Sequence, residues 1–480
     1  MKHSSRCLSL ILLAAMLGGT VACGGGTAQD ETTGGEESTE STTAVETSRL
    51  DELGDKDLSG KTFRFLDANG TPTVHQNIPA EEENGEAIND ALFKRDRYIS
   101  ERYGVEIKYE QTADQEGITA FQNSVLAGDK NYDMVVSIMT GAIGKLASAG
   151  VLADLNSLDY LSLDREWWSP LVYNSCKIDD IMYYTTGDIT PSVYCAPGCI
   201  YLNRKLAADY KISVDDVYNS VTDGKWTFDL LGQLTKDLSR DLNEDGIMKA
   251  DDDFFGMLNE PNGLTAAVFL AGAGVDLSSI DKNGSLTTNL GDEHTINSIE
   301  KLKSVLTNAS YENLQSAFLG DRAIFMLHYV SSAYTRYRDM KSDFSIFPIP
   351  KYDENQETYR SLVNTWCHAF SGVAVNADTD YVPFVMEALA YYSHVNVRPY
   401  AYENAFKNKG ARDERDAEML DIIFDTLYLD FNSFNNFGGS IDALKDALFN
   451  DGSFSSTWAS IKESTLTEMD LFSKEWTKSE

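Results

Sequence analysis

The stretch that decides the fold is "YDMVVSIMTGAIGKLASAGVLADLN", residues 132–156. Its first part, 132–138, is a short apolar run preceded by Asp133, which is typical of a buried strand in a parallel sheet. Its second part, 142–155, has the apolar spacing of a helix. A buried strand that leads directly into a helix indicates an α/β fold.

The segments before this stretch extend the same pattern. Residues 61–70 and 105–111 alternate apolar and polar side chains, which predicts two strands. Between them, 85–104 presents one apolar face and ends at a glycine, which predicts a helix. The first part of the folded body is therefore predicted to be an α/β lobe.

The later segments change in character twice. They are predicted, in order, as a strand (181–188), a strand and helix (199–210), an amphipathic helix (225–242), a mostly helical region (263–321), three strands (322–327, 343–350, 372–377) and a helical final hundred residues. Strand-rich and helix-rich parts thus alternate along the chain. This alternation predicts two lobes that are joined by more than one crossing of the chain.

The N-terminus has the features of a bacterial secretion signal. Lys2 and Arg6 precede or flank an apolar run that is too short to span a membrane. The run ends in small residues and Cys23, which resembles the lipobox of bacterial lipoproteins. We therefore expect residues 1–22 to be a lipoprotein signal peptide and Cys23 to carry lipid; an ordinary signal peptide with an incidental cysteine is the alternative.

An acidic segment follows the cysteine. Residues 23–57 hold few apolar side chains, so they bury too little surface to offset the entropy of ordering and are predicted to be a disordered tether. The whole chain has a formal net charge of −35. This charge argues against nucleic acid as a partner and against membrane binding by the folded body, which leaves the lipid as the only membrane contact.

Residues 241–252, "DLNEDGIMKADD", have the spacing of a calcium-binding loop. The expected oxygen donors are Asp241, Asn243, Asp245, the backbone carbonyl of Ile247, and Asp252. A calcium sensor would need paired loops, so a single loop indicates a structural Ca²⁺ site. The alternative is a polar turn without metal, because Lys249 places a positive charge inside the loop.

The sequence lacks the motifs of common enzyme classes. Its six histidines are scattered, and neither HExxH nor GxSxG is present. Carboxylates are so abundant that a glycosidase-like pair carries no information. We therefore expect a protein that is not an enzyme and needs no catalytic cofactor. Cys195 and Cys199 are close enough in sequence for a disulfide, and buried free thiols are the alternative.

Five segments together resemble a known family. They are the stretch at 132–156, "GKWTFDLLGQLTKDLSRDLNEDGIMKADDDFFGM", "FLGDRAIFML", "FSIFPIPKYDENQ" and "RDERDAEMLDIIFDTLYLDF". Their order and spacing resemble the extracellular solute-binding lipoproteins of ABC importers, most closely the carbohydrate-binding type related to maltose-binding protein. The resemblance covers residues 58–480. It implies a two-lobed periplasmic-binding-protein-like fold with hinge strands and a ligand cleft between the lobes.

The resemblance also implies lobe boundaries and a function. The first lobe is expected to comprise 58–187 and 322–395, and the second 188–321 and 396–480. The protein is expected to be a monomer, anchored by lipid to the outer face of the bacterial cytoplasmic membrane, that captures an oligosaccharide by lobe closure and delivers it to a permease. The alternatives are binding of a peptide or other solute, a secreted glycan-active enzyme, and a surface adhesion lipoprotein.

Candidate ligand-binding residues come from the resemblance and from local pattern. Sugars need aromatic platforms, for which the candidates are Trp366, Trp167, Phe434 and Phe437. Polar candidates stand at strand ends, where α/β lobes bind ligands: Asp188, Asn259, Glu260, Asp67, Asn69, Ser137 and Thr140. For each aromatic residue the alternative is core packing, and for each polar residue it is a turn or a helix cap.

Overall fold

A computed structural model describes most of the chain after its N-terminal segment. The described residues are 48–69, 77–138, 143–194, 196–306, 314–364, 369–401, 414–450 and 452–477. Four strands form the first sheet, in the order β11-β3-β1-β2. They are β1 (Thr62–Ala68), β2 (Glu106–Gln111), β3 (Met134–Ile138) and β11 (Ala369–Val373). β1 is parallel to β2 and β3, whereas β11 is antiparallel to β3.

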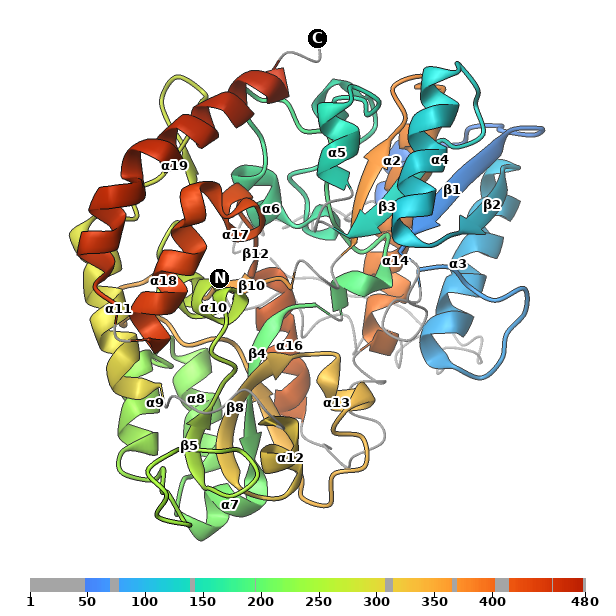
Figure 1. Cartoon of the computed structure of the whole chain (residues 1–480). Coiled ribbons are helices and arrows are strands. Elements are labelled where there is room, and N and C mark those ends of the chain that lie inside the picture. The colour runs from blue at the N-terminus through green and yellow to red at the C-terminus, as the bar shows by residue number, and fades with distance from the viewer. Residues whose placement is uncertain are drawn as a thin grey trace, which may run out of the picture. The chain divides into compact units, whose positions relative to one another are not determined.

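Of the described helices, five lie beside this first sheet in Figure 1, namely α2 (Arg49–Leu53), α3 (Ala87–Tyr103), α4 (Asp114–Leu126), α5 (Ile143–Ser148) and α14 (Val382–Asn396). The segment that leads from α5 towards the second sheet adds η1 (Leu155–Ser157), η2 (Glu166–Trp168) and α6 (Pro170–Ser175). α3 buries Leu92, Ile99 and Tyr103 and ends at Gly104, whose φ of 74° is the left-handed conformation of a helix terminus. The predicted strand–helix–strand unit is confirmed here.

The second sheet has the strand order β5-β8-β4-β9. Its strands are β4 (Gly198–Asn203), β5 (Phe255–Leu258), β8 (Ala323–Tyr329) and β9 (Phe344–Phe347). β5 and β8 are parallel, and β4 runs antiparallel to both β8 and β9. Every residue of β4, β5 and β9 is buried, which explains their continuous apolar sequences.

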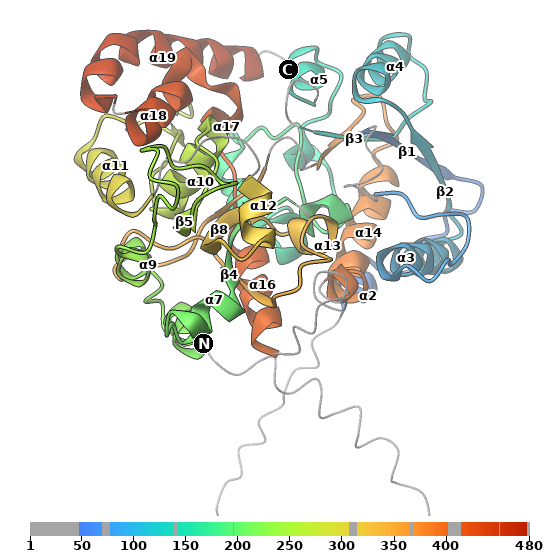
Figure 2. The same cartoon turned by 60° about the horizontal axis from the view of Figure 1, so that its bottom comes forward.

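Most of the remaining elements pack around the second sheet, as Figure 2 shows. The helices are η3 (Pro191–Tyr194), α7 (Arg204–Asp209), α8 (Val214–Thr222), α9 (Phe228–Thr235), α10 (Gly263–Gly272), α11 (Glu293–Val305), α12 (Leu314–Leu319), α13 (Ser332–Thr335), α16 (Glu414–Asp425), α17 (Phe431–Asn435), η4 (Phe437–Gly439), α18 (Ser440–Phe449) and α19 (Phe454–Trp476). Two short sheets complete the described part, β6 (Ser279–Ile280) with β7 (Leu286–Thr287), and β10 (Ser361–Leu362) with β12 (Leu427–Tyr428).

The C-terminal helix α19 connects distant parts of the body. Its middle packs against α18 and η4. Its last residue, Trp476, contacts residues 181–184, which precede the first crossing of the chain from the first sheet to the second (185–194). The Trp476 indole N–H donates to the carbonyl of Ile181 at 3.0 Å, and its own carbonyl accepts from the Tyr183 hydroxyl at 3.0 Å. The Trp476 ring also meets Tyr184 edge to face, at a centroid distance of 5.4 Å.

Three details differ from the sequence-based expectation. The helix expected over 142–155 ends at Ser148 in the described residues, because Gly150 adopts a φ of 66° and Leu152 then pairs with Ala374 beside β11. The helix expected over 225–242 ends at Thr235, since Arg240 pairs with Phe254 before β5. The turn at Gly150 closes the first helix, and Lys236 leaves the helical conformation, with a ψ of 128°, before Arg240 pairs. The apolar periodicity alone reveals neither end.

The third difference concerns the parts assigned to each lobe. We expected 322–395 to lie with the first sheet, but β8 and β9 pair with β4 in the second sheet, and only β11 and α14 lie with the first. The tether was expected to run to residue 57, but α2 is folded: Leu50 is buried and Arg49 pairs with Glu387. Among the described residues we find no helix with the length and apolarity needed to cross a bilayer.

Candidate functional site

A buried polar cluster lies at the carboxyl ends of β1 and β2. Asp67 pairs with Gln111 in the strand register, and its carboxylate accepts from the Gln111 amide at 3.3 Å. The Asn77 amide donates to both carboxylate oxygens of Asp67 at 3.4 Å, and its own oxygen accepts from the backbone N–H of Ser192 at 3.3 Å. Because Ser192 belongs to η3, the cluster joins the first sheet to the crossing that leads to the second.

Burial changes the ionisation of Asp67. The side chain is fully buried, and loss of water raises its pKa from the usual 3.8 to about 6; the amides of Asn77 and Gln111 offset part of this shift because they stabilise the charged form. The long hydrogen bonds compensate the buried charge only in part. Asp67 is therefore an ionisable group close to neutral pH at the end of a strand.

Other predicted residues of the first sheet lie at the same edge. Asn69 is buried, and its amide nitrogen has no hydrogen-bond partner in the described part of the protein. Ser137 donates to the carbonyl of Ala68 at 3.2 Å, so it supports the strand edge. Thr140 and Trp366 lie outside the described residues. Asp67, Asn69 and Ser137 are thus buried where the sequence placed them, and their role in ligand binding stays a prediction.

At the second sheet, Asn259 directly follows β5. Its side chain is fully buried, and neither its amide oxygen nor its amide nitrogen has a partner among the described residues. Each buried polar group without a partner costs about 1–3 kcal/mol. An amide that holds both a donor and an acceptor at this cost is a good candidate for hydrogen bonding to a ligand.

Charged and polar residues surround Asn259 in sequence and space. Burial raises the pKa of Glu260, and the positive charge of Arg336 partly opposes this shift. The Glu260 carboxylate accepts from the Asn262 amide at 3.0 Å, while the oxygen of Asn262 caps α10 by accepting from the Thr265 N–H at 2.8 Å. The Asn262 side chain is therefore used to cap α10 and to bind Glu260. The half-buried carboxylate of Glu260 lies next to Asn259 in the sequence.

Asp188 lies at the first crossing, but its carboxylate contacts a histidine. His394 Nδ1 of α14 is 2.5 Å from Asp188 Oδ2. Both side chains are near a small hollow, whose lining includes Glu166, Ser169, Gly187, Asp188, Val193, Tyr194, Arg398, Phe424 and Leu427. The hollow brings η2 and the first crossing together with Arg398, which follows α14, and with α16. Trp167 borders it in sequence, with a buried indole N–H that has no partner in the described residues.

The predicted aromatic platforms are mostly in packed positions. Trp167 meets Tyr391 edge to face at 5.2 Å between ring centroids. Phe437 is buried against Phe472 of α19 at 5.4 Å, and Phe434 packs on Phe431. The described structure does not bring these two phenylalanines to a strand end, and their packing explains why the sequence is aromatic there.

The 241–252 loop is folded by its own side chains. The Asp241 carboxylate accepts from the N–H groups of Glu244 and Gly246, each at 2.7 Å, and Asp245 accepts from the N–H of Ile247 at 2.8 Å and pairs with the Lys249 ammonium. The Asn243 amide donates to the Asp245 and Asp252 carboxylates at 3.4 Å each, and its oxygen accepts from the Asp245 N–H at 3.0 Å. Within the described residues no three His, Cys, Asp or Glu side chains are placed to hold a metal. The pairing of Asp245 with Lys249 agrees with the alternative of a polar turn without metal, and the calcium site stays a prediction.

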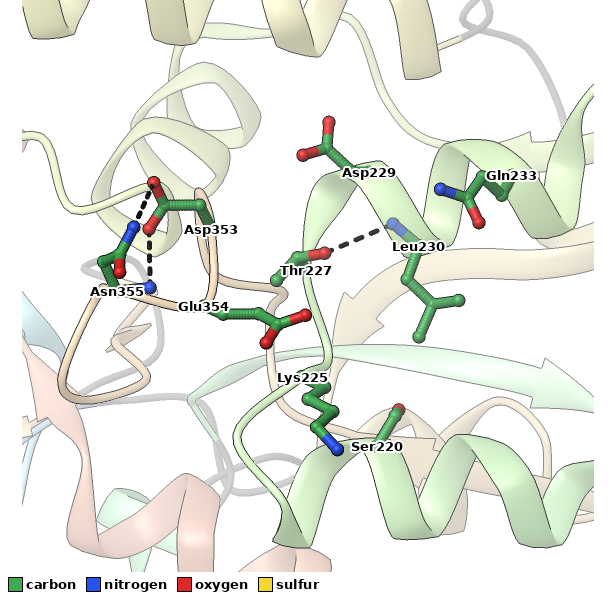
Figure 3. A pocket seen from close by; sticks show the side chains of 9 residues that line it. All are labelled: Ser220, Lys225, Thr227, Asp229, Leu230, Gln233, Asp353, Glu354 and Asn355. Atoms are coloured by element: carbon green, nitrogen blue, oxygen red, sulfur yellow. Dashed lines mark hydrogen bonds between the residues drawn. The ribbon is translucent and has the colours of Figure 1, made fainter.

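The second sheet's lobe also has a hollow of about 600 Å³ on its surface. Figure 3 shows that side chains of α8, α9 and the loop after β9 line it, namely Ser220, Lys225, Thr227, Asp229, Leu230, Gln233, Asp353, Glu354 and Asn355. Asp353 accepts from the Asn355 N–H at 2.8 Å, and Thr227 caps α9 through the Leu230 N–H. These bonds stabilise a loop and a helix end, and no predicted ligand residue lies here.

Several residues near the site were not anticipated. Gln111 follows the same strand-end rule as Asp67, so that rule could have identified it. Asn77, Ser192 and His394 have no local signal, because each acquires its role from contacts with residues far away in the sequence.

Cys199 is a buried free thiol, and Cys195 lies outside the described residues.

The ionisation of Asp67 gives a test of its environment. A raised pKa in the folded state stabilises the protein fully below pH 3.8, and this contribution is lost as the pH rises to about 6, a change of roughly 3 kcal/mol. We expect Asp67→Asn to unfold like the wild type at pH 4 and to be more stable at pH 8. Urea unfolding of both proteins at the two pH values measures this, and an identical pH dependence would contradict it.

The comparisons with known proteins agree with this architecture. Residues 79–393, well over half of the chain, match the family of bacterial extracellular solute-binding proteins. The comparison with curated proteins finds no match.

Solved structures similar to this chain are binding proteins with the same fold. The cyclic α-maltosyl-1,6-maltose binding protein of Arthrobacter globiformis is 12% identical, with 86% of this chain and 99% of the other covered and a TM-score of 0.55. The maltose-binding protein MalE of Listeria monocytogenes, solved with maltose, is 15% identical, with 85% and 97% covered and a TM-score of 0.54. These likenesses show the two-lobed α/β fold. By the family match, the chain belongs to the bacterial extracellular solute-binding protein family.

Proposed function

We propose that this protein is the substrate-binding component of an ABC importer and that it captures a carbohydrate. In this proposal the two lobes close on the ligand, and the monomer delivers it to a membrane permease. The observation that carries the proposal is Asn259, a fully buried amide without a partner among the described residues at the end of a strand.

The chemistry of the strand ends suits a neutral, hydroxyl-rich ligand. A sugar hydroxyl both donates and accepts, so one ligand group or two neighbouring groups satisfy both atoms of the Asn259 amide. Asn69 offers a second unpaired donor at the first sheet, and Asp67 and Glu260 offer acceptors. A net charge of −35 disfavours an anionic ligand.

The structural neighbours support the carbohydrate class. Besides the two described above, a cyclo/maltodextrin-binding protein solved with maltotetraose has a TM-score of 0.54 over 87% of this chain, at 12% identity. The ligands named for the three proteins are maltotetraose, cyclic α-maltosyl-1,6-maltose and maltose. A peptide or another solute is the second candidate, because the unpaired amides of Asn69 and Asn259 also suit a peptide backbone.

A ligand screen with a matched pair of variants tests the proposal. We expect one or more oligosaccharides in a glycan panel to raise the melting temperature, since a ligand at 100 times its Kd stabilises by about 2.7 kcal/mol. Asn259→Ala should weaken affinity about tenfold, from the loss of one or two hydrogen bonds, without lowering the melting temperature of the free protein.

Asn432 provides the control. It is equally buried, but it donates to the carbonyl of Leu277 at 3.0 Å and accepts from the Phe437 N–H at 3.0 Å. Asn432→Ala should therefore lower stability and leave affinity unchanged. A panel in which only peptides stabilise the protein would refute the carbohydrate class, and release of product from a stabilising glycan would show an enzyme.

We also propose that Cys23 anchors the protein by lipid to the outer face of the cytoplasmic membrane. The support is the signal-like N-terminus and the extracellular family to which the chain belongs. Cys23→Ser should appear mainly in the culture medium when cells are fractionated. A variant that stays entirely with the membrane would contradict the lipid anchor.

The calcium hypothesis for 241–252 remains a prediction that a simple measurement decides. If the loop binds Ca²⁺ in solution, chelation by EDTA should lower the melting temperature and added Ca²⁺ should restore it, because a ligand that binds only the folded state stabilises it. An unchanged melting temperature in both conditions would reject the metal site, and the loop would then be held by its internal hydrogen bonds and the Lys249–Asp245 pair alone.

A further inference from the structure

A fully buried carboxylate on α14 connects the start of the folded body to its interior. Glu387 accepts from Arg49 Nε at 2.9 Å, from the Trp168 indole N–H at 2.6 Å and from the Ser162 N–H at 3.2 Å. Arg49 also donates to the carbonyl of Tyr160 at 2.8 Å. A buried carboxylate is stable only when it is paired and hydrogen-bonded, so the charge of Arg49 balances that of Glu387.

From Glu387 the contacts continue to the first crossing. Trp168 is fully buried and packs directly on Gly187: a Cβ added there would lie 2.9 Å from Trp168 Cε3 and 2.3 Å from the carbonyl oxygen of Trp167. The next residue, Asp188, donates its N–H to that same carbonyl at 2.9 Å. The position of Trp168 therefore determines where the chain begins its passage to the second sheet.

The same side of α14 holds the other elements of the crossing. Glu387, Tyr391 and His394 follow one another at spacings of four and three residues, which places them on one face of α14. Tyr391 meets Trp167, and His394 pairs with Asp188. Two residues after α14 ends, Arg398 pairs with Asp425 of α16 at 2.6 Å. One face of α14 thus holds η2 and the first crossing, and the residues that follow the helix hold α16.

We infer that Arg49 and Glu387 are positioning residues for the first crossing (185–194), which serves as a hinge between the lobes. The N-terminal segment beginning at Ser48 thereby helps to set ligand affinity. Arg49 keeps Glu387 paired, Glu387 holds Trp168, and Trp168 fixes Gly187 and Asp188. This inference rests on the proposed function for its effect on affinity. Its effect on the hinge is independent of the ligand.

Three variants separate this role from simple attachment of the N-terminal segment. Arg49→Met leaves the Glu387 carboxylate buried without its cation. Arg49→Met combined with Glu387→Gln removes the charge and keeps an amide oxygen as acceptor for Trp168. Lys56→Met is the control, because Lys56 also attaches this segment to the body, through Asp380 at 3.0 Å, without contacting Glu387.

Hydrogen exchange and affinity are measured on the same proteins. Arg49→Met should speed amide exchange across 185–194, leave α10 unchanged, and weaken glycan affinity by roughly three- to tenfold, the scale on which residues outside a site change coupling. The double variant should recover both properties, and Lys56→Met should change neither.

Two results would overturn the inference. One is exchange that rises as much in α10 as across 185–194, which would mean global destabilisation. The other is exchange across 185–194 that stays as in the wild type. If the wild-type protein binds no glycan in the panel, the proposed carbohydrate class fails, and the exchange measurement alone still decides whether Arg49 and Glu387 position the hinge.

Discussion

The antiparallel pairing of β11 with β3 is the constraint on which the arrangement of both lobes depends. Residues 369–373 return to the first sheet after all four strands of the second sheet have been formed. The chain therefore passes from the first sheet to the second before β4 and back to the first before β11. It passes to the second sheet once more after α14, because α16 packs against β9. A body whose two sheets share several crossings is suited to hinged motion, because each sheet stays rigid while the crossings bend.

Buried ionisable side chains hold the crossings in place. Glu387 receives three hydrogen bonds, Asp188 contacts His394, and Asp67 accepts from two amides. Such groups are costly when left unpaired, so each one restricts where its partners lie. The polar interior of the first lobe therefore defines the path of the chain as much as the apolar core does.

The sequence predicted much of the fold because most strands have a recognisable local pattern of apolar residues. The apolar run at 132–138 and the alternation at 105–111 correspond to β3 and β2. What could not be read locally was the choice of partner. β8 is as apolar as β3, and only its hydrogen bonds to β4 and β5 assign it to the second sheet. In the same way, α2 is folded because Arg49 finds Glu387, more than three hundred residues later.

The candidate site shows the same division. Strand-end reasoning selected Asp67 and Asn69 at the first sheet and Asn259 at the second, and all three side chains are buried. Their binding of a ligand stays a prediction. The same reasoning gave no indication that Asp188 would be occupied by His394 or that Phe437 would pack on α19. Those outcomes depend on which helices cover the edge. A single sequence contains this information only through the complete fold.

The reach of α19 has a consequence for the order of folding. Trp476, at the end of the last helix, fills a place beside Tyr183 and Tyr184, and β11 completes a sheet begun at residue 62. The N-terminal lobe therefore lacks part of its core until nearly the whole chain has been synthesised. Contacts this distant in sequence form slowly. A chain of this design therefore completes its first lobe only when its last helix is in place.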